Sequence, residues 1–108
     1  MFVYIVSNHQ NTVFYTGVTN DIRRRMYEHK SGLQKGFTKK YQCTVLLYYR
    51  EIADPGEAIA FEKSLKKFRR SAKQRLIGSV NPGFSDLSAD WEFGELKVPL
   101  LYKPFMKR

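Results

Sequence analysis

One carboxylate in the sequence stands where packing alone does not explain it. The segment around Glu62 predicts a helix, and in helical projection Glu62 falls between Ile59 and Leu65, on the flank of the apolar stripe. A carboxylate is costly there unless it binds a cation or a metal ion. Glu62 is therefore a candidate ligand for a divalent cation. The alternative is an ordinary helix-surface bridge to Lys66, one turn on, or to Arg69.

A second candidate is a short basic segment in which Arg25 and His29 stand four positions apart. At about 100° per residue both fall on one side of a helix, at the edge of an apolar face marked by Ile22 and Met26. They are thus held against the protein body, where a site could form. Alternatively, the Arg25 guanidinium snorkels past Met26 into water. The other charged residues of this helix point away by phase: Arg23, Arg24, Glu28 and Lys30.

Two tyrosines stand on strands that precede this helix. Residues 2–6 and 13–17 are rich in aromatic and β-branched side chains and predict a β-hairpin. If the connecting loop is symmetric, Tyr4 lies opposite Tyr15 on the same face of the sheet. The two phenols then either line a site or form a cross-strand aromatic pair that fills core volume.

The elements that must position these side chains follow from local signals. Asn20 or Asp21 can cap the basic helix and Gly32 can end it in the left-handed conformation, which gives a span of residues 21–31. Residues 33–42 show no sustained period and predict a loop. In that loop lysines alternate with Phe37 and Tyr41, a mixture that suits a nucleic-acid surface.

The second half of the domain adds a strand and two helices. Residues 44–52 predict a third strand, and Asp54, Pro55 and Glu57 begin a helix that runs to about residue 70. Its predicted core face is Ala58, Phe61, Leu65 and Phe68, widened by Ile59. Ser71 can cap a third helix at residues 72–80, with Leu76, Ile77 and Val80 inward and Lys73 and Arg75 outward. The predicted fold class is α/β (α+β), a small three-stranded, mostly antiparallel sheet flanked by about three helices.

The composition favours a polyanionic partner. With 19 Lys and Arg against 10 Asp and Glu, the 108 residues carry a net charge of +9. Such a surplus favours nucleic acid, because phosphate neutralisation releases condensed counterions. A membrane surface is less suitable, since no long helix segregates its cations opposite an apolar stripe. The alternative is that the charge serves solubility alone.

Cysteine content and the N-terminus point to the cytoplasm. Cys43 is the one cysteine, so it predicts neither an internal disulfide nor a zinc site, and it should pack as a small hydrophobe. The first ten residues lack a basic leader, and no window approaches the ~18 apolar residues of a membrane span.

The C-terminal part changes in composition. After Asn81-Pro82-Gly83 the chain becomes acidic and aromatic, then rich in proline. We therefore expect a domain at residues 1–87 and an extension at residues 88–108, with Trp91 or Leu100 and Leu101 docking on the body.

The ordered set of short motifs resembles the GIY-YIG nuclease superfamily, specifically its small single-domain members. The motifs that carry the resemblance are Val3-Tyr4-Ile5, Tyr15-Thr16-Gly17, Arg25 with His29, Glu62 and Asn81. The chain departs from the family pattern at Phe2, where glycine is usual, at Val3, where isoleucine is usual, and at Thr16, where an aliphatic residue is usual. None of these changes removes a chemical group.

The resemblance implies a metal-dependent endonuclease that hydrolyses phosphodiester bonds in DNA, with Mg²⁺ or another divalent cation such as Mn²⁺, and a role in DNA repair. It implies that Tyr4 and Tyr15 line the site, that Arg25 holds the scissile phosphate and that Glu62 is the protein ligand of the metal. His29 occupies a position where the family often has His or Tyr, and Asn81 would stabilise the site. The predicted nucleic-acid contacts are Arg23, Arg24, Lys35, Lys39 and Lys40. The alternatives are a binding module of the same fold that does not cleave, and a structural protein.

Overall fold

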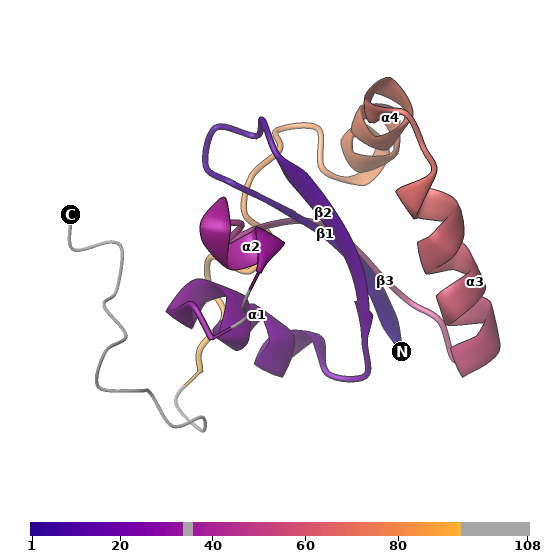
Figure 1. Ribbon diagram of the computed structural model, residues 1–108, viewed down its shortest axis with the longest axis horizontal. Helices are drawn as coiled ribbons and strands as arrows, with labels where there is room; N and C mark the ends of the chain where they lie inside the picture. Colours follow the sequence, from indigo (N-terminus) through magenta and orange to yellow (C-terminus); the bar gives the residue numbers. More distant parts are fainter. Residues whose placement is uncertain (34–35, 94–108) are drawn as a thin grey trace.

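The computed structural model describes residues 1–33 and 36–93 of the chain (Figure 1). Within these residues a three-stranded sheet lies between two pairs of helices. The strands are β1 (Phe2–Ser7), β2 (Phe14–Thr19) and β3 (Val45–Glu51). The helices are α1 (Ile22–Ser31), α2 (Phe37–Lys40), α3 (Pro55–Lys66) and α4 (Arg70–Val80). In Figure 1 α1 and α2 cover one face of the sheet, and α3 and α4 lie on the other.

The sheet is antiparallel throughout, in the order β2-β1-β3. The predicted α/β class is confirmed, and β1 lies in the centre of the sheet. The predicted hairpin register is wrong, because Tyr4 faces Gly17 and Tyr15 faces Val6. Both tyrosines nevertheless keep the same face of the sheet, since the error moves each partner by two positions and side chains alternate with a period of two.

The loop explains the register. The Asn8 carboxamide oxygen accepts hydrogen bonds from the backbone N–H groups of Thr12, at 2.9 Å, and Val13, at 3.0 Å. Asn11 adopts the left-handed conformation with φ 57°. These contacts close the loop over residues 8–13, so β1 runs to Ser7, β2 begins at Phe14, and the loop is centred one residue later than predicted.

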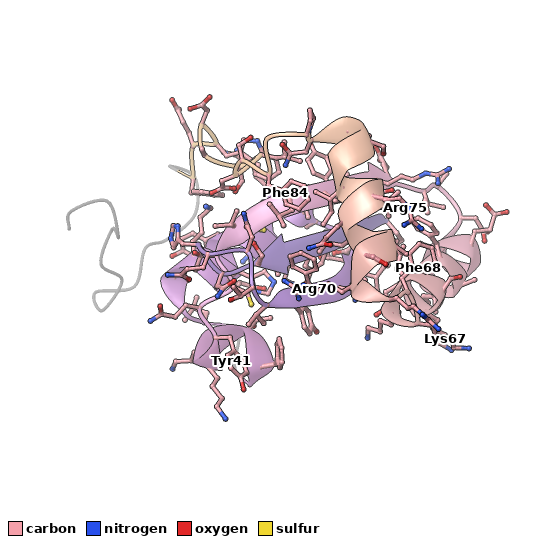
Figure 2. The ribbon with its side chains drawn as sticks, turned by 90° about the horizontal axis from the view of Figure 1, so that it is seen from above. Tyr41, Lys67, Phe68, Arg70, Arg75 and Phe84 are labelled. Carbon is pink, nitrogen blue, oxygen red and sulfur yellow. The ribbon has the colours of Figure 1, made fainter. Side chains whose placement is uncertain are left out.

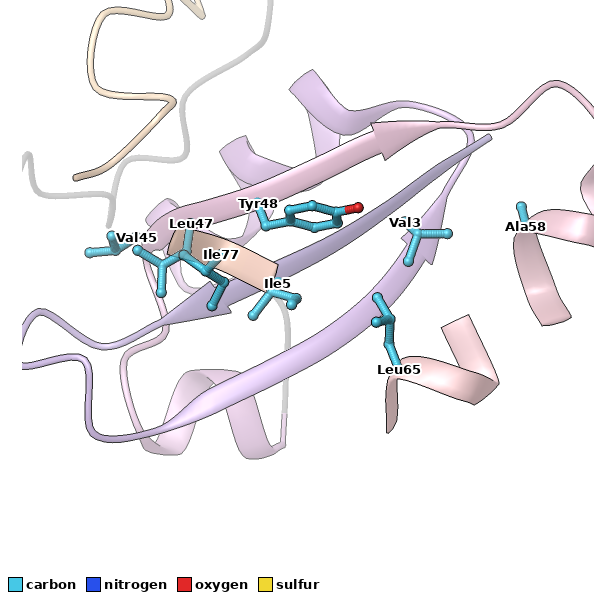
Figure 3. Close-up of a cluster of buried hydrophobic side chains, with 8 residues drawn as sticks. All are labelled: Val3, Ile5, Val45, Leu47, Tyr48, Ala58, Leu65 and Ile77. Carbon is cyan, nitrogen blue, oxygen red and sulfur yellow. The ribbon is translucent and has the colours of Figure 1, made fainter. Parts of the chain in front are cut away.

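Two apolar clusters fill the two sides of the sheet. The cluster between the sheet and the α3–α4 pair is shown in Figure 3 and contains Val3, Ile5, Val45, Leu47, Tyr48, Ala58, Leu65 and Ile77. The cluster on the α1 side contains Tyr4, Val6, Ile22, Met26, Cys43 and Leu46. Cys43 is fully buried as expected, and burial raises the pKa of its thiol to about 11.

The predicted caps at Asp21, Gly32 and Asp54 are confirmed, but the predicted cap at Ser71 is wrong, and two helix boundaries differ from the prediction. The Asp21 side chain accepts from the Arg24 N–H and Gly32 ends α1 with φ 78°, while the Asp54 side chain accepts from the Glu57 N–H. However, α3 stops at Lys66, and α4 begins at Arg70, without a side-chain cap. Phe68 therefore lies in a turn.

Several side chains predicted to be inside are exposed. The Lys67 and Phe68 N–H groups bond three residues back, to Ser64 and Leu65, a geometry that tightens and ends the helix. Phe68, Ile59 and Val80 are exposed, so their assignment to the core was wrong. Lys73 is half-buried rather than outward. Residues 33–42 are not wholly a loop, because α2 lies among them.

The residues that follow α4 return to the α1 side. Leu87, Trp91 and Phe93 pack against that cluster, so the predicted docking of Trp91 is confirmed. Leu100 and Leu101 lie outside the described residues. The division of the chain at residue 87 stays a prediction. In the described part of the chain, no helix is long and apolar enough to cross a membrane.

Candidate active site

Tyr4 is fully buried on the α1 side of the sheet, and Gly17 makes room for it. A Cβ atom at Gly17 would lie 2.5 Å from the Tyr4 hydroxyl oxygen and 2.6 Å from its Cζ. The glycine of the second motif thus lets the phenol ring lie directly over β2. This close approach fixes the position of the Tyr4 hydroxyl.

Replacing Gly17 by alanine is expected to destabilise the protein by about 1–3 kcal/mol, because a methyl group enters a packed site and the buried ring has nowhere to move. Chemical denaturation measures the change. Gly83→Ala is the matched control, since nothing lies within 4 Å of a Cβ there. Equal stability of the two variants would contradict the close approach of Tyr4 to Gly17.

The Tyr4 hydroxyl joins the two candidate residues of α1. Arg25 Nη1 donates to it at 3.1 Å, and the Tyr4 hydroxyl oxygen lies 3.2 Å from His29 Nε2. Because Arg25 can only donate, the Tyr4 O–H is left to donate to Nε2 of a neutral imidazole. Burial raises the pKa of the Tyr4 phenol, and the Arg25 guanidinium only partly opposes this, so the phenol keeps its proton at neutral pH. The predicted placement of Arg25 and His29 against the body is confirmed.

Arg25 is held between the site and the surface. Its Nε lies 3.3 Å from Glu28 Oε1, and about a quarter of each side chain is exposed. Glu28 is therefore a partner of Arg25 and does not simply point away, as predicted from phase. Arg25 retains donors that can meet an anion from solvent, since a guanidinium carries five N–H bonds.

His29 is a buried, neutral imidazole. Burial, and secondly the charge of Arg25, lower its pKa to about 4. Among the described residues its Nδ1 has no hydrogen-bond partner. His29 therefore orients Tyr4 without adding charge at neutral pH.

The buried imidazole predicts a pH-dependent loss of stability. With a pKa of about 4 in the folded protein and 6.5 as the ordinary value, the unfolded chain binds more protons between these limits. The free energy of unfolding should therefore be highest above pH 6.5 and should fall by about 3 kcal/mol as the pH drops toward 4. His29→Gln should remove this slope in denaturation curves, whereas the exposed His9→Gln should leave it. A slope that persists in His29→Gln would assign it to other groups.

Tyr15 lies beside this cluster, half-buried on β2. Its ring meets the His29 ring edge-on at 6.3 Å between centroids, and it stacks on Phe37 of α2 at 6.0 Å. The Tyr4 ring also meets the His29 ring, at 5.6 Å. The two tyrosines thus approach each other through His29 rather than as a cross-strand pair.

Glu62 is buried on α3, and its carboxylate is paired. Lys66 Nζ lies 2.6 Å from Glu62 Oε2, with 9% of the Glu62 side chain and 51% of the Lys66 side chain exposed. The bridge to Lys66 named as the alternative is therefore present. The pKa of Lys66 is raised, first by the hydrogen bond to Glu62 and more weakly by Tyr15, which places the ammonium in the electrostatic range of both.

A divalent cation fits this carboxylate. The Lys66 ammonium already occupies one of its oxygens as a cation, on a flexible and exposed side chain that can swing away. Carboxylate oxygen is the ligand type that Mg²⁺ prefers, and Mg²⁺ keeps several water or phosphate oxygens as further ligands. Among the described residues, no group of three or more His, Cys, Asp or Glu side chains could hold a metal ion. Glu62 would thus hold the cation as a single protein ligand.

Asn81 is not brought to the other candidate residues. Its Nδ2 donates to the Leu47 carbonyl at 3.0 Å and to the Ser85 carbonyl at 2.9 Å, and its Oδ1 accepts from Ser85. The β1–β3 ladder is irregular between Ile5 and Val6, where Leu47 is the extra residue of β3. An extra residue is left unpaired in the ladder, so Asn81 satisfies its carbonyl and ties the end of α4 to the sheet.

The predicted nucleic-acid contacts divide into three groups. Arg24, Lys39 and Lys40 are exposed. Arg23 is half-buried, with its guanidinium 5.5 Å from the Phe93 ring centroid, so it is not a simple solvated charge. Lys35 lies outside the described residues.

The prediction from helical phase that Lys30 points away from the protein body is also wrong. Its Nζ is 2.7 Å from Asp86 Oδ2 and donates to the Thr44 carbonyl, and only 5% of its side chain is exposed. Burial alone would raise the pKa of Asp86, but the bonds from Lys30 and Ser88 outweigh burial and lower it. Lys30 therefore anchors the segment after α4 and is not available to a ligand.

Sequence reasoning missed the place of Phe37 in the site. The residue was read as part of an irregular loop, and its stack on Tyr15 joins α2 to the tyrosine cluster. The signal that could have found it is the four-residue spacing of Phe37 and Tyr41, which puts two rings on one face of a single helical turn.

Comparison with known proteins identifies the class that this fold and site define. Residues 1–75 match the sequence model of the GIY-YIG catalytic domain. The chain belongs to this family, which is a family of nucleases.

Curated relatives and a solved structure agree with this membership. UPF0213 protein DP2720 of Desulfotalea psychrophila is 36% identical over 85 residues, which cover 78% of this chain and 76% of the relative. UPF0213 protein YhbQ of Escherichia coli is 30% identical over 97 residues, which cover 89% of this chain and 94% of the relative. The solution structure of UPF0213 protein BH0048 from Bacillus halodurans has the same fold, with a TM-score of 0.51, 24% identity, and coverage of 82% of this chain and 95% of that one.

Proposed function

We propose that this protein is an endonuclease that hydrolyses phosphodiester bonds in DNA with a divalent cation such as Mg²⁺. The observation that carries the proposal is the bond from Arg25 to the Tyr4 hydroxyl, completed by His29. These residues come from the first strand and first helix of a GIY-YIG fold, and the hydroxyl is fully buried. The buried Tyr4 hydroxyl thus orients the partly exposed Arg25 guanidinium, a cation that can bind an anionic substrate.

The proposed role of each residue follows from how far its side chain is exposed. Tyr4 is fully buried and keeps its proton, so it positions Arg25. Arg25 is partly exposed and holds the scissile phosphate, whose developing charge its remaining donors stabilise. Tyr15 is half-buried beside His29, and we assign its hydroxyl to orienting the attacking water. His29 stays neutral and fixes the orientation of the Tyr4 hydroxyl.

Glu62 would hold the cation, in exchange for the Lys66 ammonium. When bound, such a cation polarises a phosphate oxygen and lowers the pKa of a coordinated water. Asn81 acts at a distance, as a positioning residue that supports β3.

The test is a cleavage panel of branched, nicked, duplex and single-stranded DNA, with an RNA strand as a further arm, each with and without Mg²⁺. Cleavage of a DNA member only with the cation supports the proposal. Preference for branched or nicked DNA would connect the protein to DNA repair.

One observation favours a second function, a binding module that does not cleave. The Glu62 carboxylate is neutralised by Lys66, so it does not repel phosphate even without a metal ion. Binding to all members of the panel with no cleavage under any condition would establish this function instead.

DNA binding is expected to weaken steeply with salt. The net charge is +9, and each neutralised phosphate contributes roughly 0.9 to the slope of log K against log salt. Filter binding at several salt concentrations measures this slope. A flat response would exclude an electrostatic nucleic-acid partner.

A further inference from the structure

Five aromatic rings form a continuous row from the buried site to the surface. The row passes from Tyr4 to His29, Tyr15, Phe37 and Tyr41, with centroid separations of 5.6, 6.3, 6.0 and 4.8 Å along it. Its inner end carries the hydroxyl that Arg25 contacts. Its outer end therefore reaches solvent at a fixed position relative to Arg25.

The last two rings are exposed. Phe37 is 46% exposed and Tyr41 is 41% exposed, whereas Thr38 is the buried residue of α2. The two rings are therefore not the anchor of this short helix. Tyr15 stacks on Phe37 and the Lys40 ammonium lies over Tyr41, but the exposed part of each residue leaves ring surface for a third planar group.

Two exposed lysines stand on the same short helix as this outer pair. Lys40 Nζ lies 5.5 Å from the Tyr41 ring centroid, and Lys39 and Lys40 are both exposed. An apolar partner protein would leave these ammonium groups without counter-charge. A nucleic acid supplies both partners, because its phosphates pair with lysine and its bases stack on aromatic faces.

We propose that Phe37 and Tyr41 form a stacking site for an unpaired base of the substrate, at the outer end of the aromatic row whose inner end Arg25 contacts. The inference rests on the proposed function for the nature of the polymer, and it adds the substrate class. In a paired duplex the base faces are covered by their neighbours, so the site selects DNA with a flap, a bulge or a single-stranded end near the cleaved bond.

The test measures binding without cleavage, in EDTA, with the full chain. Two duplexes of the same sequence are compared, one fully paired and one with a single unpaired 2-aminopurine, whose fluorescence is quenched by stacking. The wild-type protein should quench the probe and bind the bulged duplex about tenfold more tightly. The double variant Phe37→Ala, Tyr41→Ala should lose the quenching and the preference, so that it binds the bulged and the paired duplex with equal affinity.

Phe68→Ala is the matched control. Phe68 is 39% exposed and stands between Lys67 and Arg69, but it lies at the corner between α3 and α4, away from Tyr41 (Figure 2). This variant should keep the preference, as should Phe37→Trp, which retains a ring face. Circular dichroism checks that each variant is folded.

The inference is wrong if the wild type shows no preference for the bulged duplex, or if the double variant keeps that preference. It is also wrong if Phe68→Ala loses the preference as fully as the double variant does, or if Phe37→Trp loses it. A lower oligomeric mass of the double variant in light scattering would show that the rings join two copies of the chain. If the protein cleaves DNA but does not prefer the bulged duplex, only the proposed stacking site is wrong. If it prefers the bulged duplex but does not cleave, only the proposed nuclease activity is wrong.

Discussion

Glu62→Gln is expected to lower Mg²⁺-dependent cleavage by about a hundredfold or more, while Lys66→Met leaves cleavage in place. The two variants break the same ion pair from opposite sides. Only the first removes the carboxylate that would hold the cation, and loss of an interaction worth several kcal/mol in the transition state lowers the rate by that order. The comparison separates a metal ligand from a helix-surface bridge.

Stability should not distinguish the two variants. Half of the Lys66 side chain is exposed, so the pair contributes no more than about 1 kcal/mol. Melting temperatures of both variants should therefore shift slightly. If Glu62 served only as the partner of Lys66, the two variants would have the same effect on cleavage.

Metal binding gives a readout that does not depend on turnover. Mn²⁺ titrated by electron paramagnetic resonance should bind more weakly to Glu62→Gln. It should bind more tightly to Lys66→Met, because the ammonium that competes for the carboxylate is gone. Unchanged Mn²⁺ binding in both variants would remove Glu62 from the metal site.

Features that depend on a few neighbouring residues could be predicted from the sequence. Asp21 and Gly32 bound α1 as expected, because a cap and a left-handed terminus need only the first and last turns of the helix. The same holds for Asp54 and Pro55 at the start of α3. The side of α1 that carries Arg25 and His29 followed from the apolar residues beside them.

Features that depend on distant partners could not be predicted in this way. Lys30 points away from the apolar face by phase, but Asp86 is 56 positions further along the chain and covers it. The hairpin register depended on the Asn8 side chain, which accepts from the Thr12 and Val13 N–H groups and keeps both residues in the loop. The stack of Phe37 on Tyr15 joins a helix of four residues to β2, and so short a helix leaves almost no periodic signal.

The candidate site was only partly visible for the same reason. The family motifs pointed to Tyr4, Arg25 and Glu62 one by one, because each motif is defined by a residue type and its distance along the sequence from the other motifs. The sequence left open two salt bridges for Glu62, one to Lys66 and one to Arg69. Helix geometry alone could not choose between them. The bond from Arg25 to the Tyr4 hydroxyl needed the ring to lie over Gly17, a contact that only the folded sheet defines.

Arg25→Ala is expected to lower cleavage by about a hundredfold or more, whereas Arg24→Ala has a small effect. The two arginines are adjacent, but Arg24 is exposed while Arg25 donates to the buried Tyr4 hydroxyl. Arg24 is a better control than Arg23, whose guanidinium lies over the Phe93 ring. Affinity for DNA should fall only slightly in either variant, since each loses one cation of many.

A third variant separates charge from geometry. Arg25→Lys keeps the positive charge, but an ammonium lacks the planar fork that can hold Tyr4 and a phosphate together, so cleavage should stay low. Because Arg25→Ala also removes a donor from the buried Tyr4 hydroxyl, it should cost about 1–3 kcal/mol of stability, and its activity must be measured well below its melting temperature. Single-turnover cleavage and filter binding of the three variants give the comparison. If Arg25→Ala and Arg24→Ala lower cleavage equally, Arg25 is one more surface cation and the bond to Tyr4 plays no part in the chemistry.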